Sequence, residues 1–247
     1  MKIALLSVTT AALVAASPAG AAIEKQRPLK LRETCVTRAE RAHVVRFRAS
    51  DRVRLIGVEL GQGPRVVILA HSGASDLCSW VPYGRTLAAR GYRVLAFDQR
   101  GFGSSGQSGR SNRKDRVDYD VLGAIRTMRA RGATSVILGG GSLGGAAVLS
   151  AAARATPFVN GVISFSSPTR YRRVDALGAV RTLRVPALFV AAEEDTPFPQ
   201  DAQTMYEACS SADKQVVIFP GIHHGAPLLR DPNARTLVDD FIARHSQ

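Results

Sequence analysis

Hydrophobic and polar positions fall into two patterns along the chain. Residues 42–50 and 53–60 alternate apolar with polar side chains on either side of a short polar turn. Such alternation is typical of strands with one covered face, so it predicts an antiparallel hairpin. Six later segments are continuous apolar runs, as expected for parallel strands that are buried on both faces. These runs are residues 65–71, 92–98, 135–140, 159–166, 186–195 and 214–221.

Segments of helical character separate the apolar runs. They are residues 80–91, 118–132, 143–155, 175–183, 199–210 and 234–245. Strands that alternate with helices form a mostly parallel sheet with helices on both faces. The pattern therefore predicts an α/β protein with an eight-stranded, mostly parallel sheet. No linker interrupts the sequence after Cys35, so we expect residues 22–247 to form a single domain.

The N-terminal residues have the pattern of an export signal. Lys2 precedes an apolar stretch over residues 3–16, which is short for a membrane span, and residues 19–21 form a small-residue cleavage site. We expect residues 1–21 to be a signal peptide and the mature chain to begin near Ala22. The protein would then be secreted or periplasmic, without stable membrane insertion. The alternative is that the apolar stretch remains uncleaved as a membrane anchor.

Export permits disulfide bonds, and the chain has three cysteines, Cys35, Cys78 and Cys209. Because this number is odd, at least one cysteine is unpaired within the chain. We favour a Cys35–Cys78 pair, since Cys78 falls in a loop near the candidate site described below and Cys35 lies in the N-terminal lead.

The formal net charge is +13, carried mostly by arginine. A charge of this size favours anionic surfaces, anionic substrates or nucleic acid, or it serves only to solvate the surface. No basic run is interleaved with aromatic residues, so we expect no nucleic-acid partner.

A glycine-rich run, GGGSLGG, covers residues 139–145. It contains G-x-G-x-x-G, the pattern of a dinucleotide-binding turn. That turn normally follows the first strand of its domain and needs an acidic residue about 20 positions later. Residues 139–174 contain no Asp or Glu, and the G-K-[S/T] ending of a phosphate-binding loop is missing as well. Both nucleotide interpretations are therefore disfavoured.

The same run contains G-x-S-x-G, which places Ser142 at a sharp turn from strand to helix. Gly140 and Gly144 leave room where the strand and the helix crowd each other. The N–H groups at the start of the helix favour negative charge on an attacked carbonyl oxygen. Ser142 is therefore the candidate nucleophile, and the Leu143 N–H is a candidate oxyanion donor.

A serine nucleophile needs a base that is oriented by an acid. In proteins with this turn, the acid and then the histidine follow the serine in sequence. Asp195 ends an apolar run and opens a loop, so it is the preferred acid, with Glu193 and Glu194 as alternatives. The later histidines are His223, His224 and His245. The first two come directly after the last strand, at the correct edge of the sheet, whereas the third ends the final helix.

Four motifs in the correct order resemble those of the α/β-hydrolase superfamily, and the resemblance covers residues 35–247. GGSLG (140–144) resembles the nucleophile elbow, and ILAHSGASDLCSW (68–80) resembles the oxyanion loop after the third strand. FDQRGFGSS (97–105) resembles the D-x-R-G-x-G-x-S turn, and HHG (223–225) resembles the His-Gly segment that carries the base. The superfamily implies the α/β-hydrolase fold.

The resemblance also assigns roles to single residues. The superfamily places its base directly before a glycine, so His224 is expected to be the base rather than His223. Gly73 would supply the second oxyanion N–H. Ser72 stands where the superfamily has glycine, which leaves Ala74 as an alternative donor.

Three polar residues in these motifs are expected to have structural roles. His71 should brace the oxyanion loop through hydrogen bonds, and Asp98 and Arg100 should build a turn rather than contact substrate.

The superfamily implies a serine hydrolase that cleaves an ester-type acyl bond through Ser142, His224 and Asp195, by way of an acyl-enzyme, and the expected signal peptide implies that it is exported. It would act on a small-molecule or acyl substrate and need no cofactor or metal. A thioesterase, peptidase or acyltransferase on the same triad remains an alternative, as does a non-catalytic binding protein.

Residues 167–184 fill the position where superfamily members carry a lid, and they are too few for a large cap domain. Three arginines in this segment are expected near the mouth of the site, where they either receive an anionic group or face solvent. They are Arg170, Arg172 and Arg173.

Overall fold

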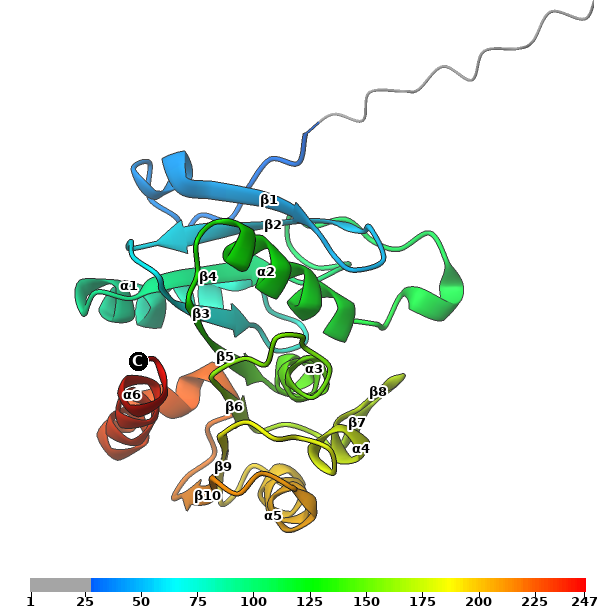
Figure 1. Cartoon of the computed structure of the whole chain (residues 1–247), viewed down its shortest axis with the longest axis vertical. Coiled ribbons are helices and arrows are strands. Elements are labelled where there is room, and N and C mark those ends of the chain that lie inside the picture. Colours follow the sequence, from blue (N-terminus) through cyan, green and yellow to red (C-terminus); the bar gives the residue numbers. More distant parts are fainter. Residues whose placement is uncertain (1–27) are drawn as a thin grey trace, which may run out of the picture.

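The computed structural model describes residues 28–247, so the expected signal peptide at residues 1–21 lies outside the described residues. Within the described part, eight strands form one sheet in the order β1-β2-β4-β3-β5-β6-β9-β10 (Figure 1). The first two pairs in this order are antiparallel and the others are parallel, which confirms the predicted sheet. The strands are β1 (Val44–Arg48), β2 (Arg54–Leu60), β3 (Arg65–Ala70), β4 (Arg93–Asp98), β5 (Ser135–Gly141), β6 (Gly161–Phe165), β9 (Ala187–Ala192) and β10 (Lys214–Phe219).

Helices cover both faces of the sheet (Figure 1). α2, α3, α4 and α5 pack on one face and α1 and α6 on the other, and each face has its own hydrophobic cluster. The helices are α1 (Val81–Ala89), α2 (Asp118–Ala130), α3 (Leu143–Ala152), α4 (Ala176–Val180), α5 (Phe198–Ala208) and α6 (Pro232–His245). Four short 3-10 helices join them: η1 (Glu40–His43), η2 (Leu77–Ser79), η3 (Ser111–Arg113) and η4 (Ala226–Arg230).

The centre of the sheet is the most deeply buried part of the fold. All seven residues of β5 and all ten of α3 are buried, which explains why their sequences consist almost entirely of apolar and small residues. Because parallel strands end at the same edge of a sheet, the loops after β3, β4, β5, β6, β9 and β10 meet at that edge. The candidate residues lie on these loops.

The segment between β6 and β9 differs from its prediction. It contains a two-stranded hairpin, β7 (Arg170–Tyr171) and β8 (Val174–Asp175), followed by the five-residue helix α4. Strands of two residues are too short to leave a periodic pattern in a sequence, so the hairpin was not predicted. The segment nevertheless has the small size expected of it.

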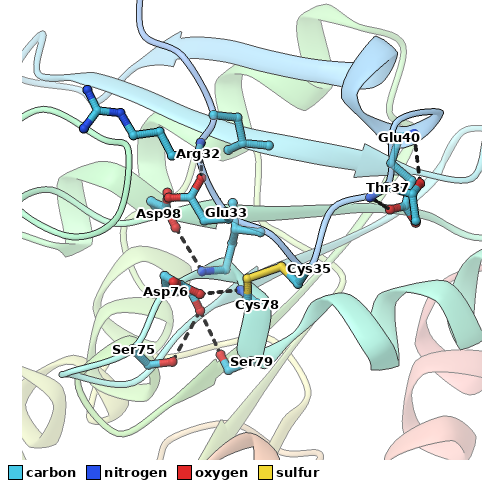
Figure 2. Close-up of a disulfide and its surroundings, with 12 residues drawn as sticks. Arg32, Glu33, Cys35, Thr37, Glu40, Ser75, Asp76, Cys78, Ser79 and Asp98 are labelled. Carbon is cyan, nitrogen blue, oxygen red and sulfur yellow. Dashed lines mark hydrogen bonds between the residues drawn. A yellow bond between two sulfur atoms is a disulfide. The ribbon is translucent and has the colours of Figure 1, made fainter.

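The N-terminal lead is tied to the body of the fold by a Cys35–Cys78 disulfide, the pair favoured from the sequence (Figure 2). Cys78 lies in η2, immediately after the loop that follows β3. Cys209 is free and buried. Among residues 28–247, no helix has both the length and the apolar character of a membrane span.

Candidate active site

Ser142 stands at the turn between β5 and α3 with a positive φ of 52° and a ψ of −119°. Such a conformation costs a non-glycine residue about 1–3 kcal/mol and persists only where its surroundings impose it. The Ser142 N–H donates to the Phe165 carbonyl over 2.8 Å, which anchors the turn to β6. A Cβ on Gly140 would collide with the Gly144 backbone, and one on Gly144 would collide with the carbonyl of Ala70. Both glycines are therefore required by close backbone contacts, as the sequence predicted.

The start of α3 offers donors beside this serine. The Ser142 side chain does not cap the helix, so its hydroxyl is not committed to the backbone. Leu143 is the first residue of α3, and its N–H has no partner within the helix. A Cβ on Gly73 would lie 3.0 Å from Leu143 Cδ2, so the loop after β3 packs directly against the turn. The structure thus brings Ser142, Leu143 and Gly73 together. Ala74, the alternative donor, has a φ of 55° in the same loop.

Asp195 and His224 meet across the ends of two neighbouring parallel strands, β9 and β10. His224 Nδ1 lies 2.9 Å from Asp195 Oδ2 and 3.1 Å from Oδ1. The Asp195 side chain is 12% exposed and that of His224 is 35% exposed, so the imidazole remains reachable from solvent. Glu193 and Glu194, the alternative acids, are both exposed. The ring of Phe198 packs 4.5 Å from the imidazole, centroid to centroid.

The loop that carries His224 lies against the serine turn. Gly225 has a φ of 67°, and its N–H donates to Ser166 Oγ over 3.1 Å. A Cβ on Gly141 would be 3.2 Å from Gly225 Cα. Because Gly141 precedes the serine and Gly225 follows the histidine, both functional residues lie on adjoining stretches of backbone.

The other two candidate histidines, His223 and His245, are placed differently. In the described structure, the His223 side chain forms no hydrogen bond or ion pair. His245 lies at the end of α6, where its Nε2 is 3.5 Å from Asp213 and its ring packs on Phe241.

Sequence reasoning missed Ser166, which holds the histidine loop, and Phe198, which packs on the imidazole. Ser166 is buried with a φ of 47° at the end of β6. Its position just after an apolar run next to the serine strand was the only signal of this role. Nothing in the sequence around Phe198 distinguishes it from an ordinary first residue of a helix.

His71 braces the loop after β3, as expected. It is fully buried; its Nδ1 donates to the Ser72 carbonyl over 2.8 Å, and its Nε2 accepts the Gln99 N–H over 3.0 Å. The Gln99 side chain donates in turn to the His71 carbonyl over 2.7 Å. Burial lowers the pKa of His71, so this ring is held neutral, which fits one nitrogen that donates and one that accepts.

Asp98 ends β4 and builds the turn beside that loop. Its carboxyl accepts the Leu77 N–H over 2.9 Å and the Ser104 N–H over 2.8 Å. Burial raises the pKa of Asp98 to about 7 against the effect of these two donors, and the adjacent Glu33 carboxyl adds to the rise (Figure 2). Burial would also raise the pKa of Glu33, but hydrogen bonds from Asp98 and Ser104 hold it below its usual range.

Arg100 is completely buried behind this turn. Its guanidinium lies 2.7 Å from Asp51 Oδ1 and 2.7 Å from Asp120 Oδ1, and the Arg100 and Asp120 side chains are both 0% exposed. The interpretation of Asp98 and Arg100 as structural residues agrees with this arrangement.

Of the three arginines expected near the mouth of the site, two have carboxylate partners. Arg170 pairs with Asp175 over 2.7 Å, and Arg172 pairs with Asp115 over 2.8 Å. Arg172 also lines a cavity of about 160 Å³ together with Phe102. Arg173 is exposed. In residues 28–247, no cluster of three or more His, Cys, Asp or Glu side chains could hold a metal ion.

Comparisons with known proteins find similar hydrolases. A family model described as serine aminopeptidase, S33, matches residues 62–182. The chain is 29% identical over 135 residues to the 2-hydroxy-6-oxo-6-(2'-aminophenyl)hexa-2,4-dienoic acid hydrolase of Metapseudomonas resinovorans. That match covers 53% of this chain and 44% of the enzyme, so the chain matches less than half the length of this curated relative.

Solved structures share the fold at low sequence identity. An esterase of Pyrococcus furiosus superposes with a TM-score of 0.70 at 18% identity, over 83% of this chain and 92% of that chain. An enol-lactonase of Burkholderia xenovorans LB400 gives a TM-score of 0.63 at 17% identity, over 78% of this chain and 98% of the other.

Proposed function

Because this chain belongs to the α/β-hydrolase superfamily, we propose that it is an exported serine hydrolase that cleaves an ester-type acyl bond. One observation carries the proposal. The His224 imidazole is hydrogen-bonded through Nδ1 to Asp195, and its loop lies against the turn that holds Ser142 at a strained φ. If His224 had only a structural role, nothing would require a strained serine turn beside it.

In the proposed reaction, Ser142 Oγ attacks the acyl carbonyl carbon while His224 Nε2 takes the hydroxyl proton. Asp195 keeps the other ring nitrogen protonated and stabilises the imidazolium. The N–H groups of Leu143 and Gly73 hold the negative carbonyl oxygen. The leaving alcohol receives the proton from His224, and an acyl-serine remains. A water molecule then attacks the acyl-serine, with His224 again as base, and releases the acid and the free Ser142.

A peptidase on the same residues is the second candidate, because the matching family model is described as a serine aminopeptidase. The two chemistries share every step except the leaving group, which is an amine in place of an alcohol. The two candidates are therefore distinguished by whether the protein cleaves substrates that release an alcohol or substrates that release an amine.

A fluorophosphonate probe and a substrate panel test the proposal. The probe should label the wild-type protein at Ser142 and should not label Ser142→Ala. Hydrolysis rates are then compared on p-nitrophenyl acyl esters, acyl thioesters and aminoacyl p-nitroanilides. Faster turnover of the esters supports the esterase, and faster turnover of the anilides replaces it with the peptidase. Absence of labelling in a folded wild-type protein would leave only a non-catalytic binding role.

The export part of the proposal rests on residues 1–21, and the Cys35–Cys78 disulfide supports it because disulfides persist mainly in oxidising compartments. N-terminal sequencing of the protein recovered outside the cytoplasm should begin near Ala22. Recovery of the chain there with Met1 intact would contradict cleavage at this site.

A further inference from the structure

A second cavity opens between the β1–β2 turn and the loop that follows β4. Its volume is about 710 Å³, and its lining contains none of the residues of the candidate active site. Five arginines line it: Arg48, Arg52, Arg54, Arg110 and Arg113. The crowding of like charges in one hollow is unfavourable unless a compensating anion is present.

The acidic residue in this lining does not provide that compensation. Asp51 accepts hydrogen bonds from Arg100 Nη1 over 2.9 Å and from Nη2 over 2.7 Å, and its side chain is only 3% exposed. Its carboxylate is therefore committed to an arginine that does not line the cavity. The lining keeps a net positive charge.

Three of the five guanidinium groups are unpartnered. The side chains of Arg52, Arg110 and Arg113 form no hydrogen bond or ion pair with any residue between 28 and 247. Arg48 donates one hydrogen bond, of 3.1 Å, to the Arg52 carbonyl. Elsewhere on the described surface, some arginines have carboxylate partners, as in the pairs Arg85–Glu40, Arg131–Glu59 and Arg90–Asp239, and others have none. The cavity is thus a hollow in which three unpartnered guanidinium groups lie close together.

The cavity opens at the same edge of the sheet as the serine turn. Ile56 of β2 pairs with Asp98 at the end of β4, so Arg54 lies just beyond that strand end. In the sheet order, β2 and β5 are separated by β4 and β3. The cavity is therefore a distinct site on the flank of the fold.

We infer that this cavity binds an oligophosphate group. Guanidinium groups match phosphate oxygens with two parallel hydrogen bonds, and several of them together call for a ligand with more than one negative charge. The volume exceeds the needs of a single phosphate, and Ser50, Gln107 and Ser108 add polar groups to the lining. The ligand is either a soluble oligophosphate or the phosphorylated headgroup of a lipid.

Isothermal titration with sodium triphosphate measures the soluble ligand, and sedimentation with phosphatidylcholine vesicles that contain a bisphosphorylated inositol lipid measures the headgroup. The test variant is Arg110→Gln/Arg113→Gln. The control is Arg126→Gln/Arg184→Gln, which removes the same charge from exposed arginines outside the cavity. Arg52→Gln is a second, single test variant from the opposite wall. Thermal unfolding confirms that each variant is folded.

We expect binding of at least one probe to weaken about tenfold or more in the double test variant, and to change less than about twofold in the control. Binding should also weaken as sodium chloride is raised. Loss confined to triphosphate identifies a soluble ligand, and loss confined to vesicles identifies a headgroup. Failure of the wild type to bind either probe, or equal loss in test and control variants, would overturn the inference. None of these outcomes depends on catalytic activity.

Discussion

Two aspartates at the carboxyl edge of the sheet have opposite surroundings. Asp98 ends β4, is 0% exposed, and accepts two backbone N–H groups beside a second buried carboxyl. Asp195 follows β9, and its carboxylate is hydrogen-bonded to the partly exposed His224. The loop that carries His224 is held at the end of β6 by a hydrogen bond from the Gly225 N–H to Ser166 Oγ. Asp98 thus belongs to a buried hydrogen-bond network, whereas Asp195 and His224 form a pair that solvent can reach, called the accessible pair below.

The difference separates residues that stabilise the fold from residues proposed to act in catalysis. The β4 flank is cross-linked by the buried Arg100 ion pairs, the His71 hydrogen bonds and the Cys35–Cys78 disulfide, so it can fix the loop that carries Gly73. The His224 flank has few such bonds, and the imidazole is reachable from solvent. Substitutions on the first flank should therefore lower stability, and those on the second should lower turnover.

The largest effect is expected at the accessible pair. His224→Ala should lower kcat about 10⁴-fold or more, because no base then activates Ser142. His223→Ala is the matched control, since it removes the adjacent imidazole, which has no side-chain hydrogen bond in the described structure. Its loss should be far smaller. The measurement is kcat on an ester substrate for both folded variants. If His223→Ala is the inactive variant instead, the base is His223 and not His224.

The buried ion pair should give the largest loss of stability. Arg100→Met leaves Asp51 and Asp120 buried without their cation, which typically costs about 3–5 kcal/mol of unfolding free energy. Arg172→Met breaks the exposed pair with Asp115 and should cost about 1 kcal/mol or less. Urea unfolding measures both. Similar losses in the two variants would contradict the structural role assigned to Arg100.

The sequence predicted the frame of the fold well, because its signals were local. Continuous apolar runs marked the parallel strands, and the glycines around Ser142 marked a turn that close backbone contacts require. The disulfide followed from counting cysteines and from where two of them fell. The family model that matches residues 62–182, together with the shared fold, supports the superfamily that the four motifs suggested.

What the sequence did not reveal depends on contacts between distant segments. Ser166 and Gly225 are 59 positions apart, and Arg100 and Asp51 are 49 apart, so no periodicity links either pair. The arginine-lined cavity is of the same kind, since it joins residues 48–54 to residues 106–113. The strands β7 and β8 were missed because two residues cannot show an alternating pattern.

Removal of the disulfide should weaken the supporting flank without disabling the accessible pair. The bond closes a loop with a sequence separation of 43, and the double substitution Cys35→Ser/Cys78→Ser should cost about 2–4 kcal/mol of unfolding free energy. At a temperature where the variant is folded, kcat should stay within about threefold of wild type, because Ser142, Asp195 and His224 are untouched. Unfolding and ester hydrolysis are measured on the same sample. A loss of turnover comparable to that of His224→Ala would show that the two flanks are not separable.

The last effect is a pH dependence and concerns the proton held by Asp98. Its pKa is about 7 in the folded protein because of burial, against an ordinary value of 3.8, so between these values the folded chain keeps a proton that the unfolded chain releases. Stability should therefore fall as the pH rises from about 4 to about 7, by at most about 1.4 kcal/mol per pH unit for one proton. The lowered pKa of Glu33 acts below its ordinary value of 4.5. Burial also raises the pKa of Asp120 to about 6, which adds to the decline, whereas the lowered pKa values of the buried His71 and of His245 oppose it. The share of Asp98 is therefore measured by comparing variants.

Glu33→Gln isolates this contribution. It removes the neighbouring carboxylate and supplies an amide N–H that can donate to Asp98, so the pKa of Asp98 should fall and the decline in stability between pH 5 and pH 7 should flatten. Glu40→Gln is the matched control. The hydrogen bond from Arg85 holds the pKa of Glu40 at about 2, so this change should lower stability equally across pH 5–7 and leave the slope as it is in the wild type. The measurement is the free energy of unfolding in urea at pH 5, 6 and 7 for the three proteins. Parallel curves for wild type and Glu33→Gln would mean that Asp98 keeps no proton in this range, and the contrast between the two aspartates would then rest on burial alone.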